Sequence, residues 1–150
     1  MKKMEIVVKK FDDFTTRELY EVLKARAEVF VVEQNCVYQD MDDKDYKSVH
    51  VIGYENGKLM AYLRAFTKEN SPKIVQLGRV LSTERGKGFG EKIVREGILA
   101  AKKYLNADQI YIEAQCYAIG FYEKLGFQVT SEEFLEDGIP HVEMIRYETN

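Results

Sequence analysis

The sequence has few of the residues that mark secreted, membrane-spanning or metal-binding proteins. Among its 150 residues are two cysteines, two histidines, two prolines and no tryptophan. No stretch approaches the roughly 18 apolar residues that a transmembrane helix needs, and the apolar run near the N-terminus is too short for a signal peptide. Cys36 and Cys116 allow at most one disulfide. We expect a reduced pair in a cytoplasmic protein that has no membrane partner.

Patterns typical of metal and nucleic-acid sites are also missing. No group of His and Cys residues has the spacing of a metal site, so we expect no metal. The acidic loop of residues 40–45 lacks the glycine and the spacing of a calcium-binding loop, and we expect its carboxylates to be solvated. A formal net charge of −3 argues against bulk nucleic-acid binding. The ten tyrosines do not form a base-stacking platform within basic patches.

What is present is the composition of a folded domain. Hydrophobic residues make up 45% of the chain and charged residues 31%, which is enough apolar material for a sizeable core. The length is typical of one domain, and no Gly/Ser-rich or Pro-rich stretch resembles a linker. We therefore expect a single domain over residues 1–150.

The hydrophobic pattern predicts an alternation of strands and helices. Thr15 and Glu18 form a capping-box pattern ahead of an amphipathic helix that continues to about residue 31. Asn56-Gly57 is a strong hairpin signal, and residues 33–48 are typical of a long loop or a short helical turn. Further helices are expected from the glycines of residues 86–90 to about Tyr104 and over 117–125, and strands over 5–8, 49–54, 59–66, 74–81, 110–114, 127–130 and 141–148.

The order of these elements predicts the fold class. Early strands are joined by hairpins and later strands by helices, which implies a mixed sheet with helices on both faces. We therefore expect an α/β fold with a mixed, mostly antiparallel sheet.

The most informative stretch is the glycine loop of residues 85–90, between a predicted strand and a predicted helix. Glycines let backbone N–H groups turn towards one point, and a helix start adds free N–H groups and the positive end of its dipole. The loop therefore suits a phosphate or pyrophosphate. The Walker pattern is absent because Gly88 follows Lys87, and the dinucleotide pattern fails because position 91 is Glu. On the loop alone, a turn that merely starts a helix stays open as an alternative.

Two blocks of sequence together resemble one family. The glycine loop matches R-x-x-G-x-G, and residues 121–127 match F-Y-x-x-x-G-F after the next predicted strand. Both patterns, in this order, are similar to those of the GNAT superfamily of N-acetyltransferases. That superfamily usually carries Asn where this chain has Gln115.

The resemblance narrows to one branch. Residues 30–36, the triplet of residues 78–80, residues 113–115 and residues 136–141 are similar to the ElaA-type branch, which carries Gln at position 115. The similarity extends over about residues 18–146, nearly the whole chain.

The resemblance implies the GNAT fold, whose sheet is splayed between its fourth and fifth strands, with acetyl-CoA as co-substrate in the gap. The pyrophosphate of CoA would lie on backbone amides of the glycine loop, and the pantetheine arm would pair with the strand before it. A splayed strand offers unpaired N–H and C=O groups that a peptide-like arm can satisfy. The implied CoA-binding residues are Val80, Leu81, Arg85, Gly86, Lys87, Gly88, Phe89, Gly90 and Gln115.

The resemblance also implies a general acid, Tyr122, whose counterpart protonates the departing CoA thiolate. A tyrosine pKa of about 10 keeps the phenol protonated, although Tyr122 could instead be a packed aromatic beside Phe121. A general base must take a proton from the attacking amine. Glu113 is our first candidate and His141 our second, with water as a further alternative. For His50, a structural role is favoured.

We therefore expect an acyltransferase that moves an acetyl group from acetyl-CoA to a primary amine of a small molecule or a peptide. Homodimers are common in the superfamily. The alternatives are a non-catalytic acyl-CoA-binding or sensing module on the same fold, and an interaction domain whose glycine loop is only structural. The basic segment of residues 79–103 suits CoA phosphates, and the acidic segments of residues 33–45 and 132–143 could attract a cationic amine.

Overall fold

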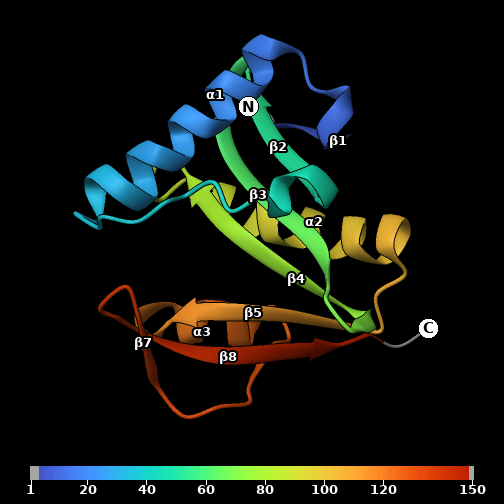
Figure 1. Cartoon of the computed structure of the whole chain (residues 1–150), viewed down its shortest axis with the longest axis vertical. Coiled ribbons are helices and arrows are strands. Elements are labelled where there is room, and N and C mark those ends of the chain that lie inside the picture. Colours follow the sequence, from blue (N-terminus) through green and yellow to red (C-terminus); the bar gives the residue numbers. More distant parts are fainter. Residues whose placement is uncertain (1–3, 149–150) are drawn as a thin grey trace.

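The computed structural model describes residues 4–148 and contains one mixed sheet with helices on both of its faces (Figure 1). The strand order is β1-β2-β3-β4-β5-β8-β6, with β7 also paired to β8. Only β4 and β5 run parallel, and all other described pairs are antiparallel. This confirms the predicted fold class. The strands are β1 (Glu5–Lys10), β2 (Val49–Glu55), β3 (Lys58–Lys68), β4 (Ser71–Ser82), β5 (Gln109–Gln115), β6 (Gln128–Val129), β7 (Phe134–Glu136) and β8 (Ile139–Tyr147).

Three α-helices accompany the sheet within the described residues: α1 (Thr16–Arg26), α2 (Phe89–Leu105) and α3 (Ile119–Lys124). None of these helices has the length and apolar character needed to cross a bilayer. Short 3-10 turns occur at Phe11–Asp13, Lys44–Lys47 and Cys116–Ala118.

Each face of the sheet has its own apolar core, because consecutive residues of β3 point to opposite faces. Tyr62 packs with Val22 of α1 in the core on the α1 side. Leu63 packs with Ile93 of α2 in the core on the α2 side. All four side chains are at most 1% exposed, and burial of such side chains stabilises the fold by about 1.5–3 kcal/mol each.

Helix α1 begins where the sequence predicts and ends earlier. Thr15 Oγ1 accepts a hydrogen bond from Glu18 N at 3.1 Å, and Glu18 Oε1 accepts one from Thr15 N at 2.9 Å, which confirms the capping box. The α-helical geometry ends at Arg26, and the helical segment continues as a wider π-helix over Ala27–Glu33, close to the predicted end near residue 31. This segment is rich in valine, whose branched side chain disfavours the α-helix.

The C-terminal part of the sheet also differs from the prediction. The strand expected over 127–130 is shorter, and the strand expected from residue 141 begins at Ile139. Strand β7, which the hydrophobic pattern does not reveal, forms a hairpin with β8 around Asp137-Gly138. The earlier hairpin at Asn56-Gly57, between β2 and β3, is confirmed.

The splay between β4 and β5 is confirmed by their pairing. The two strands pair only at residues 74–76 of β4 and 109–111 of β5. Beyond these positions β4 stays paired with β3 on its other side, and β5 stays paired with β8. The facing edges of β4 and β5 are therefore unpaired towards their C-terminal ends, and their backbone groups are free for another partner.

Candidate active site

The glycine loop lies at the N-terminus of α2, where the sequence places it. Gly86 and Gly88 have φ values of +77° and +74°, a conformation that residues with a Cβ disfavour. A Cβ at either position would meet no other atom within 4 Å, so the outer side of the loop is open. Gly88 is the N-cap of α2 and supplies no capping side chain. The N–H groups of the first turn are therefore available to an anion.

The charged side chains of the loop are exposed. Lys87 Nζ lies 2.8 Å from Glu84 Oε2, and this hydrogen bond raises the pKa of Lys87 and lowers that of Glu84. Arg85 is exposed as well. Exposed ion pairs contribute little to stability, so both cations can turn towards a bound phosphate.

The predicted CoA-contacting residues of the sheet lie on its unpaired edges. Val80 and Leu81 follow the last β4–β5 pair, and their side chains pack into the α2-side and α1-side cores respectively. Their backbone is therefore held from both faces of the sheet. Gln115 is the last residue of β5, on the opposite edge of the splay. Phe89, the first residue of α2, is buried.

The second motif lies in α3, next to the glycine loop. A Cβ at Gly90 would lie 4.0 Å from Phe121 Cζ, so the first turn of α2 is close to α3. The ring of Tyr122 packs edge-to-face on Phe121 and Phe127, with centroid separations of 5.0 and 5.7 Å. Burial raises the pKa of Tyr122, so the phenol keeps its proton at neutral pH. Its role as general acid stays a prediction.

Glu113 lies beside a second carboxylate on the α1 side of the sheet. Glu113 of β5 lies opposite Glu143 of β8 in the antiparallel pair, so the two side chains lie on the same face of the sheet. The Tyr111 hydroxyl lies 2.8 Å from Glu113 Oε2 and 2.5 Å from Glu143 Oε2. A phenol has one proton and donates it to one carboxylate at a time. Burial and these carboxylates raise the pKa of Tyr111, so Tyr111 remains the donor.

His141 lies on β8, on the same face as Glu113. The His141 side chain is 9% exposed. Its Nδ1 is 2.7 Å from the Ile139 carbonyl oxygen, and because a carbonyl only accepts hydrogen bonds, Nδ1 carries the proton. When the ring is neutral, its lone pair is therefore on Nε2, which lies 3.6 Å from Glu136 Oε2.

Glu136 of β7 connects the two candidate bases, and sequence reasoning missed it. Burial raises the pKa of Glu136, and the Glu113 carboxylate raises it further while His141 acts in the opposite direction. The structure thus brings Glu113, Glu136 and His141 into one carboxylate–histidine cluster. The Asp137-Gly138 dipeptide, a frequent hairpin turn, is the signal that could have revealed β7.

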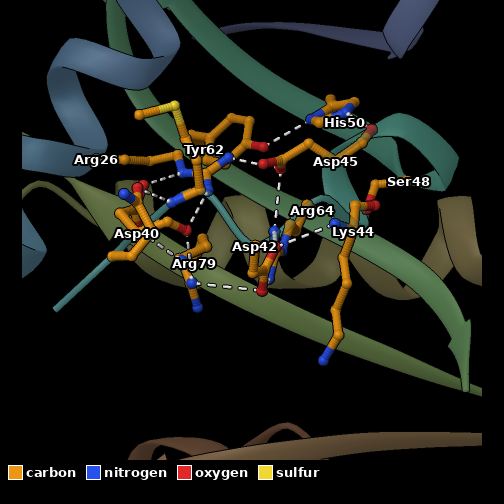
Figure 2. Close-up of polar contacts among 12 residues, drawn as sticks. Arg26, Asp40, Asp42, Lys44, Asp45, Ser48, His50, Tyr62, Arg64 and Arg79 are labelled. Carbon is orange, nitrogen blue, oxygen red and sulfur yellow. Dashed lines mark hydrogen bonds and ion pairs between the residues drawn. The ribbon is translucent and has the colours of Figure 1, made fainter. Parts of the chain in front are cut away.

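The acidic loop is the main correction to the sequence analysis. Three of its four carboxylates, those of Asp40, Asp42 and Asp45, are not solvated but form a largely buried ion-pair network with arginines from the helix and the sheet (Figure 2). Asp43 is exposed, as expected. Arg26 of α1 lies 2.9 Å from Asp40 Oδ2 and 2.6 Å from Asp45 Oδ1. Arg64 of β3 lies 2.6 Å from Asp42 Oδ2 and 3.1 Å from Asp45 Oδ1.

Arg79 of β4 completes the network through Asp40, at 2.7 Å. Three arginines thus balance the charges of the three buried or half-buried aspartates. These carboxylates are not free to attract a cationic acceptor, so the expectation for this part of residues 33–45 is wrong. The acidic segment of residues 132–143 is the remaining candidate for that role.

His50 has the structural role favoured from the sequence. Its Nδ1 lies 2.6 Å from the Tyr62 hydroxyl, and its Nε2 lies 3.0 Å from the Asp45 carbonyl oxygen. Burial lowers the pKa of His50. A neutral ring whose two nitrogens are both engaged is not available as a general base.

Metal ligands and disulfides are not found in the part of the chain that the structure describes. Over residues 4–148, no group of three or more His, Cys, Asp or Glu side chains is arranged to hold a metal ion. Cys36 and Cys116 are both free thiols.

Comparison with known proteins gives matches over nearly the whole chain. Residues 11–147 match the family model of the acetyltransferase (GNAT) domain. A UPF0039 protein of Schizosaccharomyces pombe is 37% identical over 148 residues, which cover 96% of this chain and 97% of the relative. Protein ElaA of Escherichia coli is 35% identical over 138 residues, which cover 89% and 90%.

Solved structures show the same fold. The crystal structure of an acyl-CoA N-acyltransferase from Pseudomonas aeruginosa superposes with a TM-score of 0.86 at 36% identity, over 95% of this chain and 99% of that chain. The crystal structure of Escherichia coli ElaA superposes with a TM-score of 0.89 at 33% identity, over the same shares of the two chains.

Proposed function

Because this chain belongs to the GNAT acetyltransferase family, in its ElaA-type branch, we propose that it transfers an acetyl group from acetyl-CoA directly to a primary amine. One observation carries the proposal. The open glycine loop of α2 lies close to α3, which holds Tyr122, and the edge of β4 that leads to this loop is unpaired. Acetyl-CoA needs an anion site, a strand edge and a proton donor, and these three features match those needs.

In this proposal the chain binds acetyl-CoA at two places. The free amides of the glycine loop hold the pyrophosphate, with the exposed cations Arg85 and Lys87 beside it. The unpaired backbone at Val80 and Leu81 hydrogen-bonds the pantetheine arm. The side chains of these two residues pack into opposite cores, so the edge is already rigid before the ligand arrives.

The acetyl transfer then needs a hydrogen-bond donor near the thioester sulfur of acetyl-CoA. The amine nitrogen attacks the carbonyl carbon, the C–S bond breaks, and CoA leaves as a thiolate. A thiol with a pKa of about 8.5 is a stronger acid than tyrosine, and burial raises the pKa of Tyr122 further. Tyr122 therefore acts chiefly by donating a hydrogen bond to the developing thiolate, which stabilises the negative charge as it forms.

The amine must lose its proton to the carboxylate–histidine cluster. Glu113 accepts this proton directly in our proposal, and the free Nε2 lone pair of His141 is the second acceptor. Glu136 lies between them and is partly exposed, so it can carry the proton towards solvent. The unneutralised carboxylates of residues 132–143 favour a cationic amine as the acceptor.

Release of free CoA thiol in the presence of different amines tests the proposal. We expect wild-type protein to release thiol only when a small diamine or a lysine-containing peptide is added. Tyr122→Phe should lower kcat by about 100-fold and leave the affinity for acetyl-CoA unchanged. Tyr20→Phe is the matched control, since Tyr20 is 69% exposed on α1, and it should retain full activity.

Three outcomes would contradict the proposal in distinct ways. Binding of CoA without amine-dependent thiol release would favour the sensing module. Absence of CoA binding would favour an interaction domain with a purely structural loop. Full activity of Tyr122→Phe would reduce this residue to a packed aromatic.

A further inference from the structure

We propose that Asp40 and Arg79 form a latch that holds a bulge in β4 and so positions the strand edge for acetyl-CoA. The inference rests on the proposed function, because it assigns a role to residues that shape the binding edge without touching the ligand. Both residues are positioning residues in this account.

The bulge is visible in the pairing of β3 with β4. The register shifts by one residue, so that Arg79 and Val80 of β4 together lie opposite Leu63 of β3. Arg79 has a φ of +53°, in the left-handed region that residues with a Cβ avoid. A non-glycine residue stays in such a conformation only where its surroundings hold it there.

The bulge also decides which side of the sheet the side chain of residue 79 reaches. Val75 and Leu77 point into the α2-side core, and regular alternation would send residue 79 into the same core. The extra residue turns Arg79 to the α1 side and places Val80 in the α2-side core instead. Without the bulge, a guanidinium would face an apolar core or the rest of β4 would change register.

The latch consists of two charge-assisted hydrogen bonds (Figure 2). Arg79 Nε donates to Asp40 Oδ1 at 2.7 Å, and Arg79 Nη2 donates to the Asp40 carbonyl oxygen at 2.9 Å. Asp40 is buried, and its Oδ2 accepts a hydrogen bond from Arg26 Nε at 2.9 Å, while its Oδ1 also accepts one from the Tyr38 hydroxyl at 3.0 Å. Arg79 is thus tied through Asp40 to α1, and bidentate contacts of this kind fix geometry as well as charge.

The position of the bulge links the latch to the ligand edge. Pairing of β4 with β5 ends at Gln76, and the bulge follows before Leu81. Backbone groups of a strand point alternately to its two neighbours, so one inserted residue changes which N–H and C=O groups face the unpaired side. The latch therefore determines the groups that Val80 and Leu81 offer to the pantetheine arm.

A pair of substitutions at one position tests the latch. Arg79→Ala removes the two hydrogen bonds and keeps the Cβ that disfavours a positive φ, so the bulge loses its support. Arg79→Gly also removes them but tolerates a positive φ, so the bulge can persist. We expect Arg79→Ala to raise the KM and the Kd for acetyl-CoA about tenfold, or about 1.4 kcal/mol, with kcat within about twofold. Arg79→Gly should recover most of this affinity.

The control is Arg95→Ala on the exposed face of α2, where Arg95 forms an exposed ion pair with Glu91. Its KM for acetyl-CoA should equal that of the wild type. Equal losses in Arg79→Ala and Arg79→Gly would overturn the latch, since they would show that the guanidinium itself is needed. Unchanged affinity in both variants, or a change only in the KM of the amine, would overturn it as well.

Failure of the proposed function can be told apart from failure of the latch. If wild-type protein shows no binding of acetyl-CoA by calorimetry, the proposed function is wrong. In that case, the rate of amide hydrogen exchange at Val80 and Leu81 still reports whether the bulge is maintained. Faster exchange in Arg79→Ala than in Arg79→Gly supports the latch, and equal exchange in the two variants overturns it.

Discussion

The acidic loop of residues 40–45 and the carboxylate–histidine cluster of Glu113, Glu136 and His141 differ in what surrounds their charges. In the acidic loop, every aspartate of the network has an arginine within 2.9 Å. In the cluster, carboxylates lie next to other carboxylates and to a histidine whose Nδ1 is engaged by a backbone carbonyl. Arginine pairing lowers the pKa of Asp42 and Asp45, whereas burial and a like charge raise that of Glu136.

Arginine pairing therefore decides what an acidic stretch does in this fold. Carboxylates neutralised by arginine are held in the charged form and contribute to structure. Carboxylates without a cation beside them are not held in the charged form in this way, which favours the proton exchange that a general base needs. The two regions face the same side of the sheet from β3–β4 and from β5–β8. In our proposals, the first shapes the splay and the second accepts the proton of the amine.

The largest expected effect comes from breaking the ion-pair network at its most buried member. Arg26 is fully buried and contacts both Asp40 and Asp45. Arg26→Met leaves buried carboxylates with too few cations, and we expect the free energy of unfolding in urea to fall by about 3–5 kcal/mol. Arg17→Met, on the exposed face of the same helix, should change it by at most about 0.5 kcal/mol. Equal effects of both substitutions would show that the network does not stabilise the fold.

The second prediction compares substitutions in the cluster and in the network by their effects on catalysis and on stability. Glu113→Gln should lower kcat/KM by about 100-fold and remove the acidic limb of the pH–rate profile, with little loss of stability. Asp42→Asn should lower the free energy of unfolding and leave kcat/KM nearly unchanged, because Asp42 is paired with Arg64. His141→Asn tests the second candidate base. If Glu113→Gln and His141→Asn both keep the wild-type acidic limb, the base lies elsewhere or is water.

The third effect is the response of stability to acid. Burial acts to raise the pKa of Asp45, but hydrogen bonds and attraction from Arg26 outweigh it and hold the pKa below its ordinary value. A carboxylate with a lowered folded pKa stabilises the fold above its unfolded pKa of about 4, and this contribution is lost as the pH falls further. We expect the free energy of unfolding to drop by up to about 1.4 kcal/mol per pH unit for each such carboxylate.

The contribution of Glu136 to the stability of the fold should change with pH in the opposite direction. Its raised pKa means that the charged form is disfavoured in the folded state, so it stabilises the fold less as the pH rises. Glu136→Gln should therefore increase stability slightly at pH 7 and have no such effect at pH 3. Urea unfolding of both proteins across this range measures the difference. A decrease at pH 7 would contradict the assignment of the cluster as unneutralised.

The sequence predicts well where the interacting residues are close in the chain. Thr15 and Glu18 are three positions apart and form the expected capping box. The Asn56-Gly57 turn and the glycine loop depend on backbone conformations that their own residues favour. Tyr122 and Gly126 could be placed because they belong to one short motif.

The ion-pair network could not be predicted from local pattern. Arg26 lies 14 positions from Asp40, and Arg79 lies 39 positions from it, so only the folded topology brings them together. The same holds for Glu136, which lies on a strand of three residues. An acidic run and its distant arginines look in sequence like separate solvated charges, and burial turns them into one network.

Calorimetry of acetyl-CoA binding to wild-type, Gly88→Val and Gly57→Val protein is the sharpest test of the proposed CoA site. Both glycines have nearly the same positive φ, and a Cβ at either would meet no atom within 4 Å, so the two valines impose the same backbone strain. Only Gly88 lies in the glycine loop. We predict binding by the wild type and by Gly57→Val, and binding at least about tenfold weaker, or about 1.4 kcal/mol, for Gly88→Val. Equal affinities of the two variants would contradict an anion site at this loop.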